Sequence, residues 1–416
     1  MTIFREVYVG LGGMIRCFFL CLSLCCSASF AWAGPLLEVH FIDVGQGDGI
    51  LLRTPTGKTV LIDVGPPSHR HSTTKYLKGL GIQKINLLLI THPHLDHYGG
   101  YRPVLRHFKI GAYIDPGFPY PFPKYNKMIR AIKRKGIRRL TGRLGQTLDL
   151  GGGTKLWLLA PQMPFVSDSR SDANANSIVA LLEYKNLRVL LTGDAEAETE
   201  ERLLHYKRLL RANVLKVAHH GSKHATSDTF LKAVKPRIAV ISCAKKNRYH
   251  HPHPKTMARL RRKSIRTYVT ARHGSVILRS DGQKVWMSTR GQSRKRAVQT
   301  FTLRRRPKLS LQRFRHLLSR GYAEHRSAPE SKTVSKRLGL QHEKHEWINV
   351  KRKGRHVIAK THRPSKGGYV ASRRSKVFHR HSCRFARRIP KRSRVRFRTR
   401  RAALRSGRRP AKGCRP

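Results

Sequence analysis

The sequence predicts a layered α/β domain over residues 36–288. Short apolar runs rich in Val, Ile and Leu alternate there with amphipathic stretches, and Gly, Pro and Asn separate them. Strands that alternate with helices bury their apolar faces as packed layers of sheet and helix. A domain of about 250 residues supports a sizeable core, because it hides roughly three quarters of the surface of its unfolded chain.

The expected elements follow one another without an internal repeat. The apolar runs predict strands at 37–44, 49–54, 58–63, 85–91, 154–160, 177–184, 187–192, 213–217, 237–242, 266–270 and 274–280. The amphipathic stretches predict helices at 72–80, 98–107, 124–135, 195–210, 225–233 and 255–263. We therefore place a first domain at 34–290. Residues 291–366 lack periodicity and are basic, which predicts a disordered linker with one short helix near 308–319.

The first 33 residues have the pattern of a secretory signal peptide. Arg5 and Arg16 precede an apolar run from Cys17 to Trp32. Ala31 and Ala33 flank Trp32, which places small residues at the two positions that a signal peptidase reads. A single membrane anchor is the alternative, but the run is shorter than the roughly 20 residues of a spanning helix. We expect cleavage after Ala33 and a secreted or periplasmic protein.

Cysteine usage gives no disulfide framework. Four of the seven cysteines lie in the leader, so that Cys243, Cys383 and Cys414 remain. Cys243 follows the apolar run 240–242 and is expected to be a buried core residue.

The charge of the chain is extreme and uneven. Lys and Arg number 87 against 22 Asp and Glu, a formal charge of +65 that excludes an ordinary neutral cytosolic enzyme. Residues 291–416 hold 41 Lys and Arg against 4 acidic residues. Apart from the leader no stretch is apolar enough to meet a membrane, which excludes a multi-span channel. We expect a polyanionic partner, with nucleic acid, and DNA above all, favoured.

The strongest chemical signal is the segment His92-Pro93-His94-Leu95-Asp96-His97. It follows the apolar run 85–90, so it is expected in a loop at the carboxyl end of a strand. Three imidazoles and one carboxylate within six residues form the nitrogen and oxygen ligand set that divalent metals such as zinc prefer. A polar surface loop is the alternative explanation.

Two further strand ends carry the same residue types. Asp194 ends the apolar run 187–192, and His219 with His220 follows the run 213–217. A lone Asp after a strand is more often a helix cap, and a lone His pair is more often on the surface. Three such strand ends together favour a metal site.

These segments resemble the metallo-β-lactamase superfamily, whose signature is H-x-H-x-D-H, and within it the hydrolase domain of the ComEC competence proteins. The resemblance spans residues 37–288 and rests on Phe41–Asp48, Leu61–Gly65, His92–His97, Asn176-Ser177, Leu191–Asp194, His219–Ser222 and Tyr249–Pro254. It implies an αββα sandwich with two divalent metal ions, Zn or Mn, at one edge. ComEC proteins also contain a membrane channel, which this chain lacks.

The resemblance also implies a role for each matching residue. His92 and His94 would hold one metal, Asp96 and His97 the other, and Asp194 would bridge them. Either His219 or His220 would complete the second site. Further residues would orient the ligands, shape the floor or contact substrate, and these are Asp43, Gln46, Asp48, Asp63, Asn176, Ser222, His251 and His253. His251 and His253 have the alternative role of capping a loop.

One departure from the superfamily concerns the first metal. No histidine occurs between His107 and His205, where the superfamily has a third ligand, and this chain has Asn174–Ser177 instead. A second departure is His250, where the ComEC branch has Gly.

The resemblance implies hydrolysis by a metal-activated hydroxide, with Asp96, Asp194, His219 and His220 in the catalytic centre. The basic charge favours a phosphodiesterase, and most of all a nuclease acting on DNA. The alternatives are a hydrolase of cell-wall or lipid phosphoester head groups and a non-catalytic DNA-binding surface protein. Lactam hydrolysis is disfavoured, since the motifs match a different branch.

Residues 367–416 carry a second resemblance. Phe378–Cys383 and Ser406–Pro416 are similar to the zinc-binding domain of Ada-type DNA repair proteins, a small α+β zinc-knuckle-like module. That domain uses four cysteines, whereas the matching positions here are His379, Cys383, Ala411 and Cys414. Ala411 cannot bind metal, which leaves His381 or water to complete one zinc site. A disordered cationic tail is the alternative, and either form would bind nucleic acid in a salt-dependent way.

Overall fold

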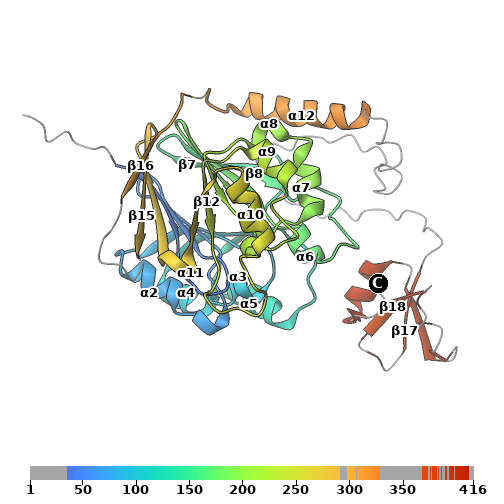
Figure 1. Ribbon diagram of the computed structural model, residues 1–416. Coiled ribbons are helices and arrows are strands. Elements are labelled where there is room, and N and C mark those ends of the chain that lie inside the picture. Colours follow the sequence, from blue (N-terminus) through green and yellow to red (C-terminus); the bar gives the residue numbers. More distant parts are fainter. Residues whose placement is uncertain are drawn as a thin grey trace, which may run out of the picture.

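Two β-sheets form the centre of the molecule (Figure 1). The structure is a computed structural model, and it describes residues 35–290, 298–305, 307–327 and most of 368–411. The larger sheet has nine strands in the order β16 (Gln299–Thr302), β15 (Lys284–Arg290), β14 (Ser275–Ser280), β1 (Leu37–Phe41), β2 (Ile50–Arg53), β3 (Thr59–Ile62), β4 (Lys84–Leu89), β5 (Lys109–Asp115) and β6 (Arg138–Thr141). The smaller sheet has seven, in the order β13 (Arg266–Val269), β12 (Ile238–Ile241), β11 (Val214–Lys216), β10 (Leu187–Leu191), β9 (Val179–Tyr184), β8 (Thr154–Ala160) and β7 (Thr147–Gly151).

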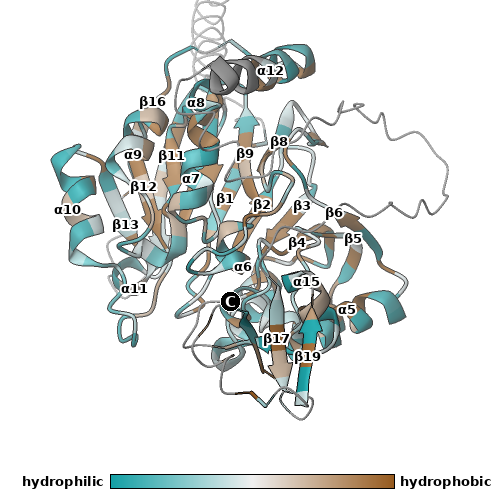
Figure 2. Ribbon diagram, turned by 90° about the vertical axis from the view of Figure 1, so that its right-hand side faces the viewer, coloured by the Kyte–Doolittle hydropathy of each residue, from teal (hydrophilic) through white to brown (hydrophobic). Residues whose placement is uncertain are grey.

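The two sheets pack face to face, and strand alternation explains how. In β8, Leu156 and Leu158 join the apolar core between the sheets, whereas Trp157 and Leu159 point to the opposite face and join a second core under helices. Successive side chains of a strand point to opposite faces, so a strand that is apolar on both faces can be covered on both sides. The brown strands in Figure 2 lie in the interior for this reason.

Helices cover both outer faces. The larger sheet is covered by α2 (Ser72–Lys78), α3 (Leu95–Tyr98), α4 (Tyr101–His107) and α5 (Pro123–Arg134). The smaller sheet is covered by α7 (Ala197–Leu204), α8 (Lys207–Leu210), α9 (Asp228–Val234), α10 (Pro254–Arg262) and α12 (Leu311–Ser327). Short helices occupy the connections: η1 (Pro67–His69), α6 (Asp172–Ala175), η2 (Ala218–Gly221) and α11 (Thr270–His273). The layers are therefore helix, sheet, sheet and helix, which confirms the predicted αββα sandwich.

Parallel strands decide where a site can form. Strands β3 to β6 pair in parallel in one sheet, and β10 to β13 do so in the other. The carboxyl ends of parallel strands meet at one edge, where the following loops gather. The segments after β4, β10, β11 and β12 carry the motif histidines, Asp194, the His219-His220 pair and the loop around Tyr249.

The folded domain extends beyond the boundary predicted at residue 290. Strand β16 pairs with β15 at the edge of the larger sheet, and Leu303 joins the core between the sheets. Helix α12 lays Phe314 and Leu318 on the smaller sheet. It begins at Leu311, near the start of the helix predicted at 308–319, and ends at Ser327, beyond the predicted end. The described residues 299–305 and 307–318 are thus part of the sandwich, not of a disordered linker.

A small α+β unit lies near the carboxyl terminus. Strands β19 (Arg394–Phe397), β17 (Tyr369–Ser372), β18 (Val377–Arg380) and β20 (Arg409–Pro410) form one sheet, with α15 (Arg400–Arg405) beside it. Its core consists of Ala371, Phe378 and Ala403. Arg380 and Arg400 form ion pairs of 2.9 and 2.7 Å with Asp168 and Asp172 of the larger domain.

Three predictions concern segments that the structure does not describe. The leader, residues 1–33, lies outside the described residues, and so do Cys414 and the linker segment 328–366. Among the helices that are described, none combines the length and apolar character needed to cross a membrane.

Candidate metal centre

The motif histidines lie in the turn between β4 and α3. Strand β4 ends at Leu89, His94 is the residue before the first turn of α3, and Asp96 and His97 belong to that helix. Both His92 and His97 are fully buried. The Thr91 hydroxyl lies 3.1 Å from Nδ1 of His92, which leaves Nε2 of His92 facing the interior of the site.

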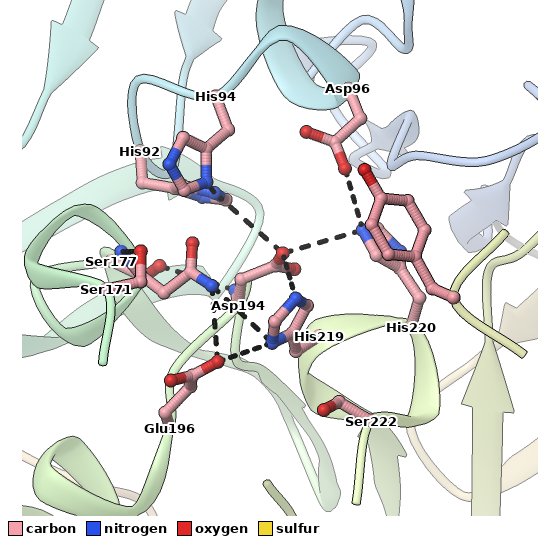
Figure 3. Close-up of polar contacts among 12 residues, drawn as sticks. His92, His94, Asp96, Ser171, Ser177, Asp194, Glu196, His219, His220 and Ser222 are labelled. Atoms are coloured by element: carbon pink, nitrogen blue, oxygen red, sulfur yellow. Dashed lines mark hydrogen bonds and ion pairs between the residues drawn. The ribbon is translucent and has the colours of Figure 1, made fainter. Parts of the chain in front are cut away.

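Four side chains from three loops converge on one point. Asp96, His97, Asp194 and His220 each offer a ligand atom, and these atoms lie within 4.8 Å of one another. Figure 3 shows Asp96, Asp194 and His220 pointing toward one another. Oδ2 of Asp194 lies 3.3 Å from Nε2 of His97 and 3.5 Å from Nε2 of His220. Oδ2 of Asp96 lies 3.4 Å from Nε2 of His220. Of the two histidines after β11, His220 is the one that joins the second predicted set.

Each imidazole of this cluster is held through its other nitrogen. Nδ1 of His97 lies 2.7 Å from Oδ2 of Asp63, and Nδ1 of His220 lies 2.9 Å from the carbonyl oxygen of Ser242. Metal-binding histidines typically have such a partner, because it fixes the ring and its tautomer. Asp63 is itself fixed by the backbone N–H and hydroxyl of Thr91, at 2.8 and 2.7 Å.

The buried polar atoms of the cluster fit a bound cation. Nε2 of His97, Nε2 of His220 and Oδ1 of Asp194 are buried, and among the described residues they have no hydrogen-bond partner. Unpaired buried polar atoms are costly, so three at one point call for a common partner. Two imidazole nitrogens and carboxylate oxygens are the donor set of a borderline divalent metal.

His219 lies on the other side of Asp194. Its Nε2 is 3.7 Å from Oδ2 of Asp194, and its Nδ1 is 2.7 Å from Oε1 of Glu196. Nε2 of His92 is 3.8 Å from the same Asp194 oxygen and 3.1 Å from Nδ1 of His94. His92, His94 and His219 therefore lie around Asp194, opposite the first cluster. His219 gives this group a third imidazole, although no histidine occurs between His107 and His205, where the superfamily has its third ligand.

The charges of the cluster favour ionised carboxylates. Burial alone would raise the pKa of Asp194, but His220, His97 and His219 hold it well below its usual value. Burial alone would lower the pKa of His220, but Asp194 and Asp48 raise it to about 10. Burial lowers the pKa of His92, and the neighbouring His97 adds to the effect. The carboxylates that draw protons onto His97 and His220 would equally draw a cation, and cation binding would release those protons.

A buried ion pair lies beneath the second cluster. Lys216, in β11, is fully buried, and its Nζ is 2.8 Å from Oδ2 of Asp48 and 3.0 Å from the carbonyl oxygen of Val217. Oδ1 of Asp48 lies 3.6 Å from Nδ1 of His220. Lys216 holds the pKa of Asp48 below its usual range against the effect of burial. The carboxylate thus stays charged beside His220.

Several predicted residues lie away from the cluster. Asp43 accepts a hydrogen bond from the Gly45 N–H, and Ser222 accepts one from the His224 N–H, so both shape loops. His253 caps α10 by accepting a hydrogen bond from the Lys255 N–H. Asn176 binds both the N–H and the carbonyl of Val166 and fixes that loop.

A pocket of about 380 Å³ opens over the cluster. His251 lies at this pocket, with its ring centroid 5.5 Å from that of His219. Burial, His220 and His219 lower the pKa of His251 to about 4. The remaining lining residues come from both sheets and include Gln46, Tyr120, Phe122, Arg170, Asn174 and Tyr249.

Sequence reasoning missed four residues that support the cluster: Glu196, Lys216, Arg170 and Asn174. Glu196 lies two residues after Asp194 and also binds Arg170 and the Asn174 amide. Lys216 reads as an ordinary basic residue in a strand. The only signal for them was position. Glu196 and Lys216 lie within three residues of a predicted ligand, Asn174 belongs to the segment Asn174–Ser177, and Arg170 precedes that segment by four residues.

The predicted tail zinc site is described only in part. Nδ1 of His379 lies 3.9 Å from Sγ of Cys383, while His381 is exposed. Cys414 lies outside the described residues, so this site stays a prediction. The Ala411 N–H donates to the carbonyl oxygen of Phe378 and anchors β20 to β18.

An αββα sandwich with histidines and carboxylates gathered at its strand ends defines a metal-dependent hydrolase domain. The model of the metallo-beta-lactamase superfamily matches residues 42–245, and this part of the chain belongs to that superfamily.

Three curated relatives share the domain. ComE operon protein 3 of Bacillus subtilis is 32% identical over 278 residues, covering 62% of this chain and 35% of that protein. Recombination protein 2 of Haemophilus influenzae is 30% identical, covering 63% of this chain and 32% of that protein. Competence protein ComA of Neisseria gonorrhoeae is 28% identical, covering 58% and 30%. The chain thus spans about a third of the length of these relatives.

Proposed function

We propose that this protein is a secreted metal-dependent phosphodiesterase that cleaves DNA. The observation that carries the proposal is the convergence of two groups of imidazoles on Asp194, at a pocket in a chain of net charge +65. A strongly basic protein attracts polyanions, and DNA is the polyanion that contains phosphodiester bonds. The names of two of these relatives, which refer to recombination and to competence, support the same substrate.

Two divalent ions, Zn²⁺ or Mn²⁺, would supply a nucleophile at neutral pH and would stabilise the charge that develops on a phosphoryl group. His92, His94 and His219 would hold one ion, Asp96, His97 and His220 the other, and Asp194 would face both. Asp63 and Glu196 hold the rings of His97 and His219 in orientation. His251 is neutral near pH 7, so it can accept a hydrogen bond from a substrate at the pocket.

The test is cleavage of end-labelled single- and double-stranded DNA by the purified chain with Mn²⁺, Zn²⁺ or a chelator. We expect metal-dependent cleavage that Asp194→Asn abolishes and that Asp149→Asn, an exposed aspartate in β7, leaves intact. Hydrolysis of phosphorylated lipid or cell-wall head groups without DNA cleavage would replace the nuclease proposal by the phosphoester alternative. DNA binding without hydrolysis of any phosphoester would leave only the binding-protein alternative.

Secretion is a separate part of the proposal and has its own test. If the leader is cleaved after Ala33, the exported protein begins at Gly34. Amino-terminal sequencing of protein from the periplasm or culture medium reads this directly. Recovery of the uncleaved chain in the membrane fraction would favour the anchor instead.

A further inference from the structure

An exposed aromatic side chain lies at the pocket over the metal cluster. Tyr249 is 47% exposed and is one of four large apolar or aromatic side chains exposed in the part of the chain that the structure describes. It belongs to the loop after β12, and the same loop exposes three cationic side chains, Lys245, Lys246 and Arg248. An aromatic ring among cations at a solvent-open site is the composition of a nucleic-acid binding surface.

The loop that carries Tyr249 is fixed by one side chain. Nδ2 of Asn247 donates to the carbonyl oxygens of Ala244 and His251, at 3.0 and 2.7 Å. Its Oδ1 accepts from the N–H groups of Tyr249 and His251, at 3.2 and 2.9 Å. Such bonds close the loop on itself. The position of Tyr249 is therefore set before any ligand arrives, which reduces the entropy cost of binding.

The Tyr249 ring is placed against the site and not merely on the surface. It stacks on His251 with centroids 5.6 Å apart and planes 23° from parallel. The guanidinium of Arg248 lies 4.9 Å from the ring centroid, and Nη2 donates to the phenolic oxygen at 2.7 Å. The His251 ring is in turn 6.2 Å from the ring of His220. The stack thus runs from solvent toward the metal cluster.

Two further aromatic side chains line the same pocket. Tyr120 and Phe122 precede α5, their centroids are 5.8 Å apart, and Tyr120 packs edge-on against His94 at 5.8 Å. The pocket is therefore lined by aromatic groups from loops that follow strands of both sheets, β5 and β12. Nothing in the fold requires Tyr249 for packing, because it remains half exposed while the residues of the described core are buried.

We propose that Tyr249 is a nucleobase-stacking subsite, which holds the base next to the scissile phosphate while Arg248 neutralises a flanking phosphate. The ligand is an unpaired nucleotide of any base, since every base has a π-face and stacking on an aromatic ring tolerates sequence. This inference rests on the proposed nuclease function, because it assumes that the phosphodiester in the pocket belongs to a polynucleotide.

The test compares two oligonucleotides that differ only in their bases. Fluorescence anisotropy would measure binding of a labelled oligothymidylate and of an abasic oligonucleotide of equal length, at fixed salt and with a chelator to prevent cleavage. Loss of one stacked base costs about 1–3 kcal/mol, so Tyr249→Ala should weaken oligothymidylate binding about 5- to 150-fold. Binding of the abasic strand should be unchanged, and Tyr249→Phe should retain both affinities.

The controls separate this inference from the proposed function. Leu311→Ala, at an exposed apolar residue in α12 on the far side of the sandwich (Figure 1), should bind both strands like the unaltered protein. Equal weakening of both strands by Tyr249→Ala, or no weakening of either, would overturn the stacking subsite. DNA cleavage lost in Asp194→Asn would still stand in that case. Absence of cleavage in the unaltered protein would remove the proposed function itself.

Discussion

Two adjacent histidines after β11 serve two different groups because of their backbone. His219 and His220 have φ of 47° and 53°, a left-handed conformation that non-glycine residues seldom adopt. Strain of this kind is held in place by its surroundings and is common at functional sites. The turn sends His220 to Asp96 and His219 to Glu196. Sequence reasoning had to choose between them for one site, whereas the structure uses both.

Glu196 gives the first residue-scale prediction, which concerns metal affinity. Its carboxylate holds Nδ1 of His219, and loss of such a partner commonly reduces metal affinity 10- to 100-fold. We expect Glu196→Gln to weaken one of two Mn²⁺ or Zn²⁺ equivalents by about that factor and to leave the other unchanged, as measured by competition with a chelating dye. Glu201→Gln, at an exposed glutamate of α7, the helix that Glu196 precedes, is the control. Unchanged affinity for both equivalents would remove Glu196 from the site.

Cys243 gives the second residue-scale prediction. Burial raises the pKa of its thiol to about 11, and the side chain is fully inaccessible. Since only the thiolate reacts with a disulfide reagent, we expect no labelling of Cys243 in the native protein at pH 8 and labelling once the protein is unfolded. Mass spectrometry of the labelled peptides distinguishes it from Cys383, which is partly exposed. Native labelling of Cys243 at the rate of Cys383 would contradict the packing.

The site was predictable as far as its residues carry a sequence pattern. The segment from His92 to His97 and the strand-end residue Asp194 stand out because metal ligands cluster by type and follow apolar runs. Lys216 and Glu196 carry no such pattern, because a single charged residue in a strand or helix is usually solvated. What gives them a role is the contact with Asp48 and with His219. The Lys216–Asp48 contact exists only after the two sheets have packed, and the Glu196–His219 contact joins the loops that follow the paired strands β10 and β11.

At the scale of elements, β16 and α12 were not predicted as part of the sandwich. Their apolar residues are few and widely spaced among Lys and Arg, so the segment reads as a basic linker. In the structure, Phe314 and Leu318 are four residues apart and therefore share one face of α12, and this face rests on the smaller sheet. Long basic side chains then occupy the exposed face. A helix whose composition is mostly polar can therefore still pack one apolar face against a sheet.

Phe314 gives the element-scale prediction. Its ring is fully buried and lies 4.8 Å from the indole of Trp157, measured between centroids. Truncation of a buried Phe to Ala typically costs about 3–5 kcal/mol. We expect Phe314→Ala to lower the free energy of unfolding by that amount in urea denaturation followed by circular dichroism. Arg315→Ala, at an exposed residue of the same helix, should change it by less than about 0.5 kcal/mol. Equal stability of the two variants would mean that α12 is dispensable to the sandwich.

At the scale of the whole molecule, charge separates into two regions with different architecture. Residues 328–416 hold 30 Lys and Arg against 3 acidic residues, and the apolar core cluster of their described part has only three buried members, Ala371, Phe378 and Ala403. Strand β19, Arg394–Phe397, is hydrophilic for this reason (Figure 2). The fold of the sandwich follows from its apolar periodicity, whereas the small unit has too little core for periodicity to reveal it. Its recognition from sequence depended on two short segments around Cys383 and Cys414.

Removal of residues 328–416 gives the last prediction, because it separates the binding of DNA from the cleavage of DNA. Each phosphate that a cation neutralises adds about 0.9 to the slope of log affinity against log salt for duplex DNA. We expect the truncated chain to bind duplex DNA with a slope smaller by about 3 or more, as measured by anisotropy between 50 and 300 mM salt, roughly the range in which such binding is measurable. The sandwich and its candidate metal site are complete at residue 327, so cleavage of short oligonucleotides at low salt should persist. Equal slopes would show that the basic region does not contact phosphates. Loss of cleavage at low salt together with an unchanged unfolding profile would instead place the small unit in the catalytic site, beside Asp168 and Asp172 where Arg380 and Arg400 already touch the sandwich.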